Sequence, residues 1–432
     1  MTTKTNLVLC VLSILIALAP VASGQGLPSA PPRSVGLSQQ RLERIGMLMQ
    51  EHVEGGLLAG AVALVARDGK VAYLKSVGMQ DQERNVAMKP DAIFRIASMS
   101  KPITSVAVMM LYEEGWFRLS DPVSKYLPEF KDMKVLVSDP AGDGGKATEH
   151  IVPAKREITI RNLLTHTSGL TYHWDPRVGA KYAEAGITHG LIQTEDSLAE
   201  GIKKLARIPL VHQPGEAFTY SLSIDVLGRL VEVISEMPFD QFLQKRIFEP
   251  LQMNDTGFYL PNGKVSRLAA IYGPDASGAL ERLGDGILGE GAMRVCVTYP
   301  YEGPKRYFSG GGGLCSTVSD YARFCQMMLN GGALDGVRLL SRKTVELMTA
   351  DHVGELNPSS GFGLGFGVTR SLREAGELTS TGAYRWGGFW YTTFFIDPAE
   401  KLIGVCMVQL HPSGKATLND KFEALAHQAI VN

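Results

Sequence analysis

The sequence lacks the patterns that mark nucleic-acid-binding and metal-binding proteins. Its 43 lysines and arginines are balanced by 44 acidic residues, with no basic stripe and no acidic tail, so nucleic acid is not an expected partner. Neither Cys-x-x-Cys nor His-Glu-x-x-His occurs, and the nine histidines are scattered. We therefore expect no metal site and no other cofactor. The length of 432 residues and the 45% hydrophobic content are typical of a globular protein with more than one core.

The longest apolar stretch lies at the start of the chain. Lys4 precedes a run from Leu7 to Ala19, and Ala22-Ser23-Gly24 offers small residues for cleavage. This run is shorter than the roughly 20 apolar residues of a membrane span, because Pro20 follows it. We expect residues 1–24 to be a signal peptide cleaved near Gly24, which predicts a periplasmic or secreted protein without a stable membrane anchor.

Cysteine is scarce, with five in the whole chain. Four remain beyond the expected cleavage site, and in an oxidising compartment they can pair in three ways or stay reduced. The sequence does not choose among these states for Cys296, Cys315, Cys325 and Cys406.

Strand patterns gather at the two ends of the chain. Residues 38–53 have helical apolar spacing behind a serine cap, and an Asp-Gly turn between two apolar runs predicts a hairpin over 59–74. Near the other end, 391–396 and 402–408 predict two further strands, and 422–430 a closing helix.

The middle of the chain is mainly helical. Segment 139–157 is rich in glycine and charge, which indicates a surface loop. Apolar spacing or a capping residue predicts helices over 99–115, 160–166, 197–206, 224–237, 239–247 and 317–330. The expected fold class is α+β, an antiparallel sheet flanked by terminal helices, from residues 25–95 and 355–432, with an inserted mainly helical domain over 96–354. A cleft between the two parts is a preferred place for a ligand site.

Ser98-Met99-Ser100-Lys101 is the leading chemical motif, because it stands where a strand gives way to a helix. Residues three apart on a helix share a face, so the Lys101 amine is expected beside the Ser98 hydroxyl. The helix N-terminus favours a developing oxyanion, and burial of a lysine favours its neutral, proton-accepting form. Pro102 in the first turn agrees with a helix that starts at or just before Ser98. Taken alone, the motif is weak and more often marks a serine cap followed by an exposed lysine.

Further motifs follow this one in a fixed order. They are Leu163-Leu-Thr-His-Thr-Ser-Gly-Leu170, Pro214-Gly-Glu-x-Phe-x-Tyr220-Ser, Gly310 to Gly313 leading into Ser316-Thr-Val-Ser-Asp320-Tyr-Ala-Arg-Phe324, and Trp386-Gly387-Gly388. With Ser98-x-x-Lys101, this set resembles the serine β-lactamase and penicillin-binding protein superfamily, in particular the class C β-lactamases and, closer still, the family VIII carboxylesterases. The resemblance extends from about residue 37 to residue 430 and implies a β-lactamase-like fold.

The resemblance implies a role for each matched residue. Ser98 matches the acylated serine, Lys101 the lysine and Tyr220 the tyrosine that helps to move the proton. Trp386-Gly387-Gly388 stands where β-lactamases carry Lys-Thr-Gly, so the backbone N–H groups of Ser98 and Phe389 are the implied oxyanion donors. Two glycines suit a strand that must lie close to substrate.

Each of these residues also has a structural interpretation. The two glycines fit a β-bulge before core aromatic residues, and Tyr220 fits an ordinary tyrosine near a helix start that Asp225 or a serine caps. His166 is a tempting general base, but the chain has no Gly-x-Ser-x-Gly elbow, and the resemblance implies that this histidine lies in a structural turn. The loop from Tyr172 to Ile187 is expected to shape the pocket, with Trp174 and Tyr182 as candidates to line it.

Two departures from the β-lactamase pattern bear on the substrate. Leu222 replaces an asparagine that binds the substrate amide, and Trp386 replaces a lysine that meets a carboxylate. These changes disfavour an anionic amide and suit a neutral ester. We therefore expect an exported serine hydrolase that cleaves small-molecule carboxylic esters through an acyl-enzyme. The alternatives are a β-lactamase or D-amino-acid peptidase of the same superfamily, and a non-catalytic receptor for cell-wall fragments.

Overall fold

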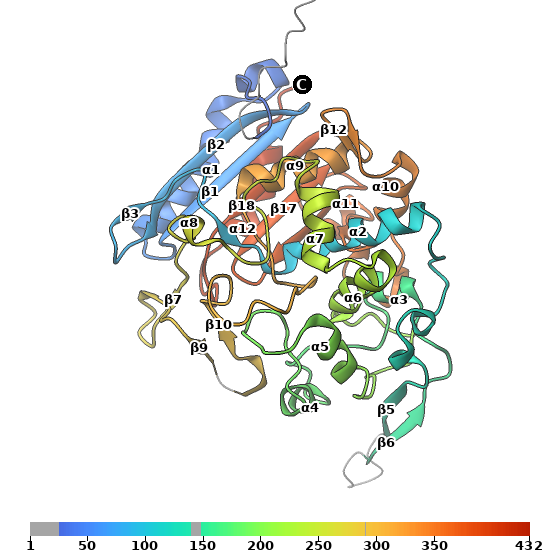
Figure 1. Ribbon diagram of the computed structural model, residues 1–432. Coiled ribbons are helices and arrows are strands. Elements are labelled where there is room, and N and C mark those ends of the chain that lie inside the picture. The colour runs from blue at the N-terminus through green and yellow to red at the C-terminus, as the bar shows by residue number, and fades with distance from the viewer. Residues whose placement is uncertain (1–25, 140–147, 290) are drawn as a thin grey trace, which may run out of the picture.

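The computed structural model of the chain describes residues 26–139, 148–289 and 291–432 (Figure 1). The expected signal peptide therefore lies outside the described residues. No helix in the described part of the chain is long and apolar enough to cross a membrane.

An eight-stranded antiparallel sheet, in the order β14-β15-β16-β17-β18-β1-β2-β3, occupies the upper half of the molecule. Its strands come from both ends of the chain, since β1 pairs with β2 on one side and with β18 on the other. The predicted hairpins at the two ends thus lie side by side, as expected. The strands are β1 (Gly60–Arg67), β2 (Lys70–Asp81), β3 (Val86–Ala87), β14 (Gly361–Phe362), β15 (Gly367–Val368), β16 (Tyr384–Gly388), β17 (Thr392–Asp397) and β18 (Leu402–Met407).

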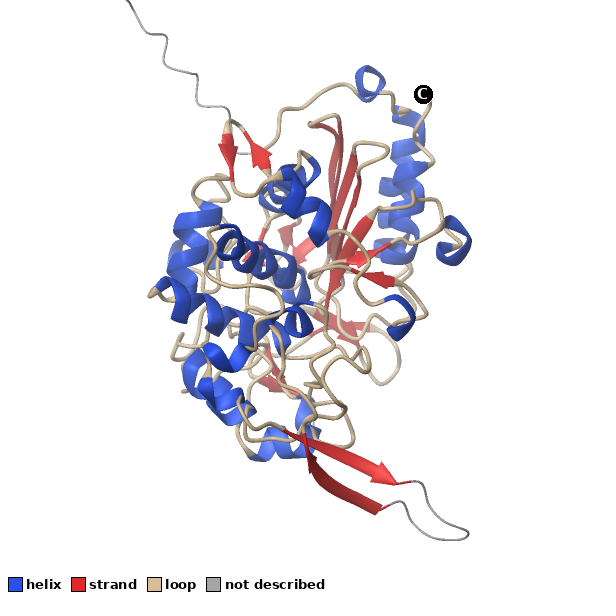
Figure 2. Cartoon of the chain, turned by 90° about the vertical axis from the view of Figure 1, so that its right-hand side faces the viewer, coloured by secondary structure: helices blue, strands red, loops and turns tan. Residues whose placement is uncertain are grey.

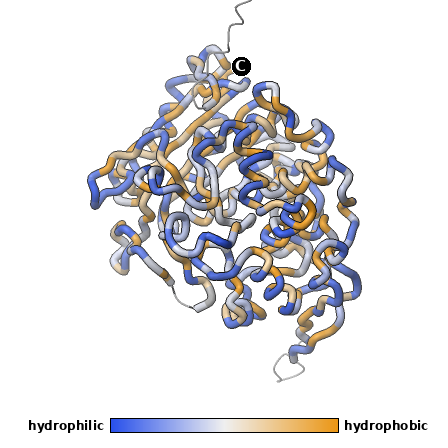
Figure 3. The backbone as a smooth tube through the Cα atoms, in the orientation of Figure 1, coloured by the Kyte–Doolittle hydropathy of each residue, from blue (hydrophilic) through white to orange (hydrophobic). Residues whose placement is uncertain are grey.

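Helices cover both faces of this sheet (Figure 2). Successive side chains of β1 point to opposite faces: Ala61, Ala63 and Val65 pack with α1 (Gln39–Glu54) and α12 (Leu418–His427). Val62 and Leu64 belong to the apolar cluster on the other face, where α9 (Val318–Leu329) packs. Because both faces are covered, β1 is a continuous apolar run rather than an alternating one. Hydrophobic stretches follow these strands in Figure 3.

The remaining helices lie beside and below the sheet (Figure 1). Thr159 and Ser197 form capping boxes at α3 and α5, which is why those helices begin where the sequence predicts. The helices are α2 (Ser100–Glu113), α3 (Ile160–Leu164), α4 (Gly179–Glu184), α5 (Leu198–Leu205), α6 (Ser223–Ser235), α7 (Phe239–Leu243) continued by a π-helical turn (Gln244–Phe248), α8 (Asn262–Val265), α10 (Arg342–Met348) and α11 (Leu372–Ala375). One apolar cluster runs from the inner sheet face through α2 to α5 and α6. The domain boundaries at 95/96 and 354/355 stay a prediction.

The structure corrects two predictions. Residues 139–157 are not simply a loop, because β5 (Lys134–Asp139) pairs with β6 (Thr148–Pro153) in a hairpin that projects from the molecule (Figure 2). Most of β6 is exposed, so burial imposes no apolar pattern on its sequence. The closing helix begins at Leu418 rather than Phe422, since its first turn is mostly polar.

Short two-stranded pairs fill much of the remaining chain. They are β4 (Phe94–Arg95) with β11 (Cys315–Ser316), β7 (Tyr272–Pro274) with β8 (Leu280–Arg282), β9 (Ile287–Leu288) with β10 (Val295–Cys296), and β12 (Ala333–Leu334) with β13 (Val337–Arg338). The four cysteines named above are all buried and unpaired, so among the states that the sequence left open the structure has free thiols.

Candidate active site

The backbone turns sharply where β4 meets α2, and this turn presents Ser98. Residues Ala97–Met99 form a single 3-10 turn before α2 begins at Ser100. Ala97 has a φ of 43°, in the left-handed region that costs a residue with a Cβ energy. Ala97 and Met99 are buried, whereas Ser98 is partly exposed. The strained turn therefore directs the serine side chain outward from an otherwise buried segment.

Lys101 lies beside this serine, as the three-residue spacing predicts. Its Nζ is 3.0 Å from Ser98 Oγ and 2.6 Å from the carbonyl oxygen of Gly311, to which it donates. The side chain is almost completely buried, at 1% exposure. The alternative of a serine cap with an exposed lysine is therefore wrong.

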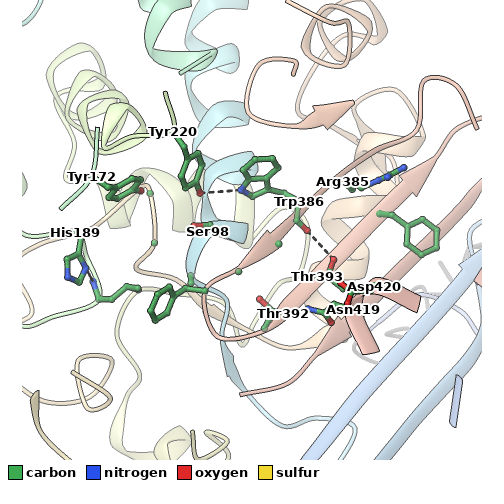
Figure 4. Close-up of a pocket in the computed structure, with 18 of the residues that line it drawn as sticks. Ser98, Tyr172, His189, Tyr220, Arg385, Trp386, Thr392, Thr393, Asn419 and Asp420 are labelled. Atoms are coloured by element: carbon green, nitrogen blue, oxygen red, sulfur yellow. Dashed lines mark hydrogen bonds between the residues drawn. The ribbon is translucent and has the colours of Figure 1, made fainter. Parts of the chain in front are cut away.

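Tyr220 completes the group. Lys101 Nζ lies 4.6 Å from the centre of the Tyr220 ring, so residues from two distant parts of the sequence converge. The indole Nε1–H of Trp386 donates to Tyr220 Oη at 3.3 Å, the dashed contact in Figure 4. Trp386 thus contacts the phenol directly. The sequence did not predict this contact, since it showed only that a tryptophan stands where β-lactamases carry a lysine.

Aromatic rings hold Tyr220 from several sides. Tyr172 lies 5.4 Å from it between ring centres, and His166 4.8 Å. Trp174 stacks on Tyr172 at 4.4 Å and is 51% exposed, so it lines the pocket as expected. Tyr182, the other candidate, is fully buried in the core and does not line the pocket.

His166 belongs to the scaffold behind Tyr220. It has a φ of 54° in the turn after α3, is fully buried, and its Nδ1 accepts the backbone N–H of Ser221 at 3.2 Å. Burial, with the nearby charge of Lys101, lowers the pKa of His166 well below its usual value of 6.5. The imidazole is therefore neutral and forms part of the turn, which agrees with the structural role that the resemblance implies for this histidine.

Strand β16 lies against the turn that presents Ser98. Thr392 Oγ1, in the adjacent strand, donates to the carbonyl oxygen of Ile96 at 3.4 Å. A Cβ added to Gly388 would collide with that same carbonyl, so glycine is required there for close approach. At Gly387 the only nearby atom is the Thr392 carbonyl oxygen at 3.3 Å. A Cβ at position 387 would therefore make one tight contact but would not collide with the backbone.

At the start of α6, Ser221 Oγ accepts the backbone N–H of Ser223 at 3.4 Å, so the serine alternative fits better than Asp225. The helix begins at Ser223, and its N-cap residue Leu222 makes no side-chain capping bond. Asp225 lies inside the first turn and does not cap the helix. Leu222 is buried at 1% exposure, so the position where β-lactamases carry the amide-binding asparagine is apolar and belongs to the core.

A cavity of about 670 Å³ opens over Ser98. One end is aromatic, with Tyr172, Trp174, Tyr220 and Trp386, and Gly387, Gly388 and Phe389 also line it. The other end reaches α12, where Asn419 and Asp420 line the cavity (Figure 4). Arg385 of β16 pairs there with Glu423 of α12 at 2.9 Å. All of the predicted site residues except buried Lys101 line this cavity. In the ranges that the structure describes, no group of three or more His, Cys, Asp or Glu side chains gathers as a metal site.

Comparisons with known proteins match most of the chain. The Beta-lactamase family model matches residues 47–428. An uncharacterised protein of Mycobacterium tuberculosis is 35% identical over 84% of this chain and 89% of its own length. Esterase EstB of Burkholderia gladioli is 32% identical over 82% of this chain and 87% of its own. The solved structure of EstCE1, described as a hydrolase with promiscuous acyltransferase activity, has a TM-score of 0.76 and 29% identity, covering 91% of this chain and 99% of that one.

Proposed function

We propose that the chain, which belongs to the β-lactamase family, is a serine ester hydrolase that works through an acyl-enzyme on Ser98. The family match and the EstCE1 fold confirm the family and the α+β, β-lactamase-like fold that the sequence predicted. EstB and EstCE1, an esterase and a hydrolase, agree with the expectation of ester cleavage.

The observation that carries the proposal is the contact between Lys101 Nζ and Ser98 Oγ at 3.0 Å, with the Tyr220 ring beside the amine. A hydroxyl becomes a nucleophile when a base within hydrogen-bond distance removes its proton. Binding alone requires none of these three groups in contact. The arrangement therefore favours catalysis over a receptor that only holds cell-wall fragments.

The proposed mechanism uses the contacts between Ser98, Lys101 and Tyr220. The Lys101 and Tyr220 pair takes the Ser98 proton as the hydroxyl oxygen attacks the ester carbonyl carbon. The backbone N–H groups of Ser98 and Phe389 hold the negative oxygen of the tetrahedral intermediate. Ser98 lies two residues after Ile96 and Phe389 directly follows Gly388, and Ile96 and Gly388 are in close contact. The C–O bond to the alcohol then breaks, and Tyr220 returns the proton to the leaving oxygen. Water, which loses a proton to the same pair, then attacks the acyl carbon. The bond to Ser98 Oγ breaks, the pair returns the proton to that oxygen, and the acid is released.

The lining of the cavity supports a neutral ester rather than an anionic amide. Leu222 is buried and offers no hydrogen bond to a substrate amide, and the Trp386 indole N–H is directed at Tyr220. Trp386 carries no charge, so a substrate carboxylate at that end of the cavity would lose water without gaining an ion pair. This loss would weaken binding of an anionic substrate.

The test is a panel of p-nitrophenyl esters of increasing chain length, run beside nitrocefin and a D-Ala-D-Ala peptide. Ester turnover should dominate, and Ser98→Ala should abolish it while leaving the melting temperature close to that of the wild type. Faster turnover of nitrocefin or the peptide than of every ester would favour the β-lactamase or peptidase alternative instead. Substantial ester turnover by Ser98→Ala would refute the assignment of the nucleophile.

Export is a separate part of the proposal and is supported by the sequence of residues 1–24 alone. N-terminal sequencing of the protein recovered from a periplasmic or culture fraction should give a chain that begins near Gln25. Recovery of the protein only from the cytoplasm, with Met1 or Thr2 at its N-terminus, would contradict it.

A further inference from the structure

A carboxylate lies buried behind Lys101, and the mechanism above does not use it. Asp225, in the first turn of α6, is completely buried. An isolated charge in the interior is costly unless another charge or hydrogen bonds compensate it. An aspartate at such a position therefore needs an explanation.

The contacts of Asp225 lead to Lys101. Its Oδ1 accepts the Ser309 hydroxyl at 2.6 Å, and Ser309 is also completely buried. Its Oδ2 lies directly against Gly311, where an added Cβ would collide with it, and the backbone N–H of Gly311 favours the charged form of the carboxylate. The carbonyl oxygen of Gly311 in turn accepts Lys101 Nζ at 2.6 Å. The carboxylate and the ammonium thus face the two sides of one glycine.

Three other titratable groups near this pair, Tyr172, Tyr307 and His166, are neutral near pH 7. Burial raises the pKa values of Tyr172 and Tyr307 well above their usual 10, and burial lowers that of His166 well below 6.5. Burial raises the pKa of Asp225 to about 6, although its bond from Ser309 and the charge of Lys101 oppose this. Asp225 is therefore mostly ionised at neutral pH.

Lys101 has no carboxylate within ion-pair distance among the residues that the structure describes, since its direct contacts are Ser98, the Gly311 carbonyl and the faces of Tyr220 and Tyr172. At 1% exposure, water does not compensate its charge either. In a low-dielectric interior, a carboxylate one residue away acts strongly on such an ammonium.

We propose that Asp225 is a positioning residue for the reaction: it provides the counter-charge of Lys101 across Gly311 and, through its bond with Ser309, fixes the Gly311 carbonyl that orients the amine toward Ser98. It does not touch the substrate. This inference rests on the proposed function and adds a residue to its proton-transfer apparatus.

The experiment compares the pH dependence of kcat/KM for a p-nitrophenyl ester between the wild type and Asp225→Asn. Asparagine keeps the shape and an acceptor for Ser309 but removes the negative charge, so the Lys101 and Tyr220 pair releases its proton more easily. The acidic limb should move to lower pH by about one unit, the lower end of the shift that a nearby opposite charge produces. The plateau should fall by about tenfold, because a base that binds its proton less tightly is weaker.

Ser309→Ala is the matched control, since it removes the hydrogen bond that Asp225→Asn can keep but leaves the carboxyl group in place, and the comparison is made above pH 7, where that group ionises. It should lower the plateau without moving the acidic limb to lower pH. A purely structural role of Asp225 predicts the same behaviour for both variants, namely a lower plateau with the limb in its wild-type place. That result in folded Asp225→Asn would overturn the inference.

Two further measurements separate the possible failures. Melting temperatures from circular dichroism show whether Asp225→Asn folds, and if it does not, Asp225→Ser removes the same charge with a smaller hydroxyl side chain and should show the same shift. Labelling of Ser98 by a fluorophosphonate at pH 8 tests the proposed function in the wild type. An unlabelled wild type refutes the proposed function, whereas a labelled wild type with an unmoved limb in a folded neutral variant refutes only the role of Asp225.

Discussion

Two adjacent glycines in β16 provide a sharp test of how the site is assembled. At Gly388 an added methyl group would lie well under 3.0 Å from the backbone oxygen of Ile96 and from the hydroxyl of Thr392. Cβ atoms in proteins essentially never come closer than 3.0 Å to such atoms. The threonine hydroxyl can rotate, but the Ile96 carbonyl is backbone, so β16 and the turn before Ser98 must separate by at least about half an ångström. At Gly387 the same methyl group meets only one oxygen, at 3.3 Å.

A misplacement of about 1 Å between reacting groups can cost roughly 100-fold in rate. Gly388→Ala should therefore lower kcat for a p-nitrophenyl ester by roughly 10- to 100-fold, equivalent to about 1.4–2.7 kcal/mol of transition-state stabilisation. Gly387→Ala should remain within a few-fold of the wild type. The assay is steady-state hydrolysis, with melting temperatures recorded to confirm that both variants fold. Equal activity of the two variants would refute the argument that β16 positions the Ser98 turn.

Three further outcomes follow from the contacts described above. Trp386→Phe keeps an aromatic ring but removes the N–H donated to Tyr220, so kcat should fall about 3- to 10-fold, and an unchanged kcat would show that this bond is not used. Lys101→Met keeps the length of the side chain but removes the base, so esterase kcat should fall by at least about 100-fold, the lower end of what a positioned base contributes; retention of more than a tenth of the activity would contradict its role. Burial alone would lower the pKa of His427, but its 2.9 Å contact with Asp397 raises the pKa above 6.5, so its stabilising effect is complete below pH 6.5 and is lost as the pH rises through the raised value. The melting temperature of the wild type should therefore fall as the pH rises above 6.5, whereas that of His427→Gln should not show this fall. A fall of equal size in the variant would contradict the role of His427.

Features encoded in local sequence patterns could be predicted well. The hairpin of β1 and β2 has an Asp-Gly turn between two apolar runs, and α3, α5 and α9 begin at capping residues, so each was expected close to its observed place. The contact between Ser98 and Lys101 follows from three-residue spacing at a helix start. Tyr220 was expected from the resemblance alone, because nothing in its own surroundings distinguishes it from other tyrosines.

Features that depend on the packing of distant segments were missed. The bond from Trp386 to Tyr220 joins residues 166 positions apart, and Asp225 meets Ser309 across 84 positions. Asp225 was interpreted as a possible cap because aspartate near a helix start is common there, and only the tertiary fold shows that its carboxylate faces Gly311. The β5–β6 hairpin was missed because an exposed strand lacks the alternation that burial imposes.

The central claim is that Ser98 becomes covalently acylated, and mass spectrometry tests it most directly. The protein is incubated with a fluorophosphonate or with a slowly hydrolysed p-nitrophenyl ester, quenched in acid and digested. A mass increase equal to the phosphonyl or acyl group is predicted on the peptide that contains Ser98, and it should be absent from Ser98→Ala. Active, turning-over enzyme that carries no adduct on this peptide, or carries it on another residue, would contradict the account.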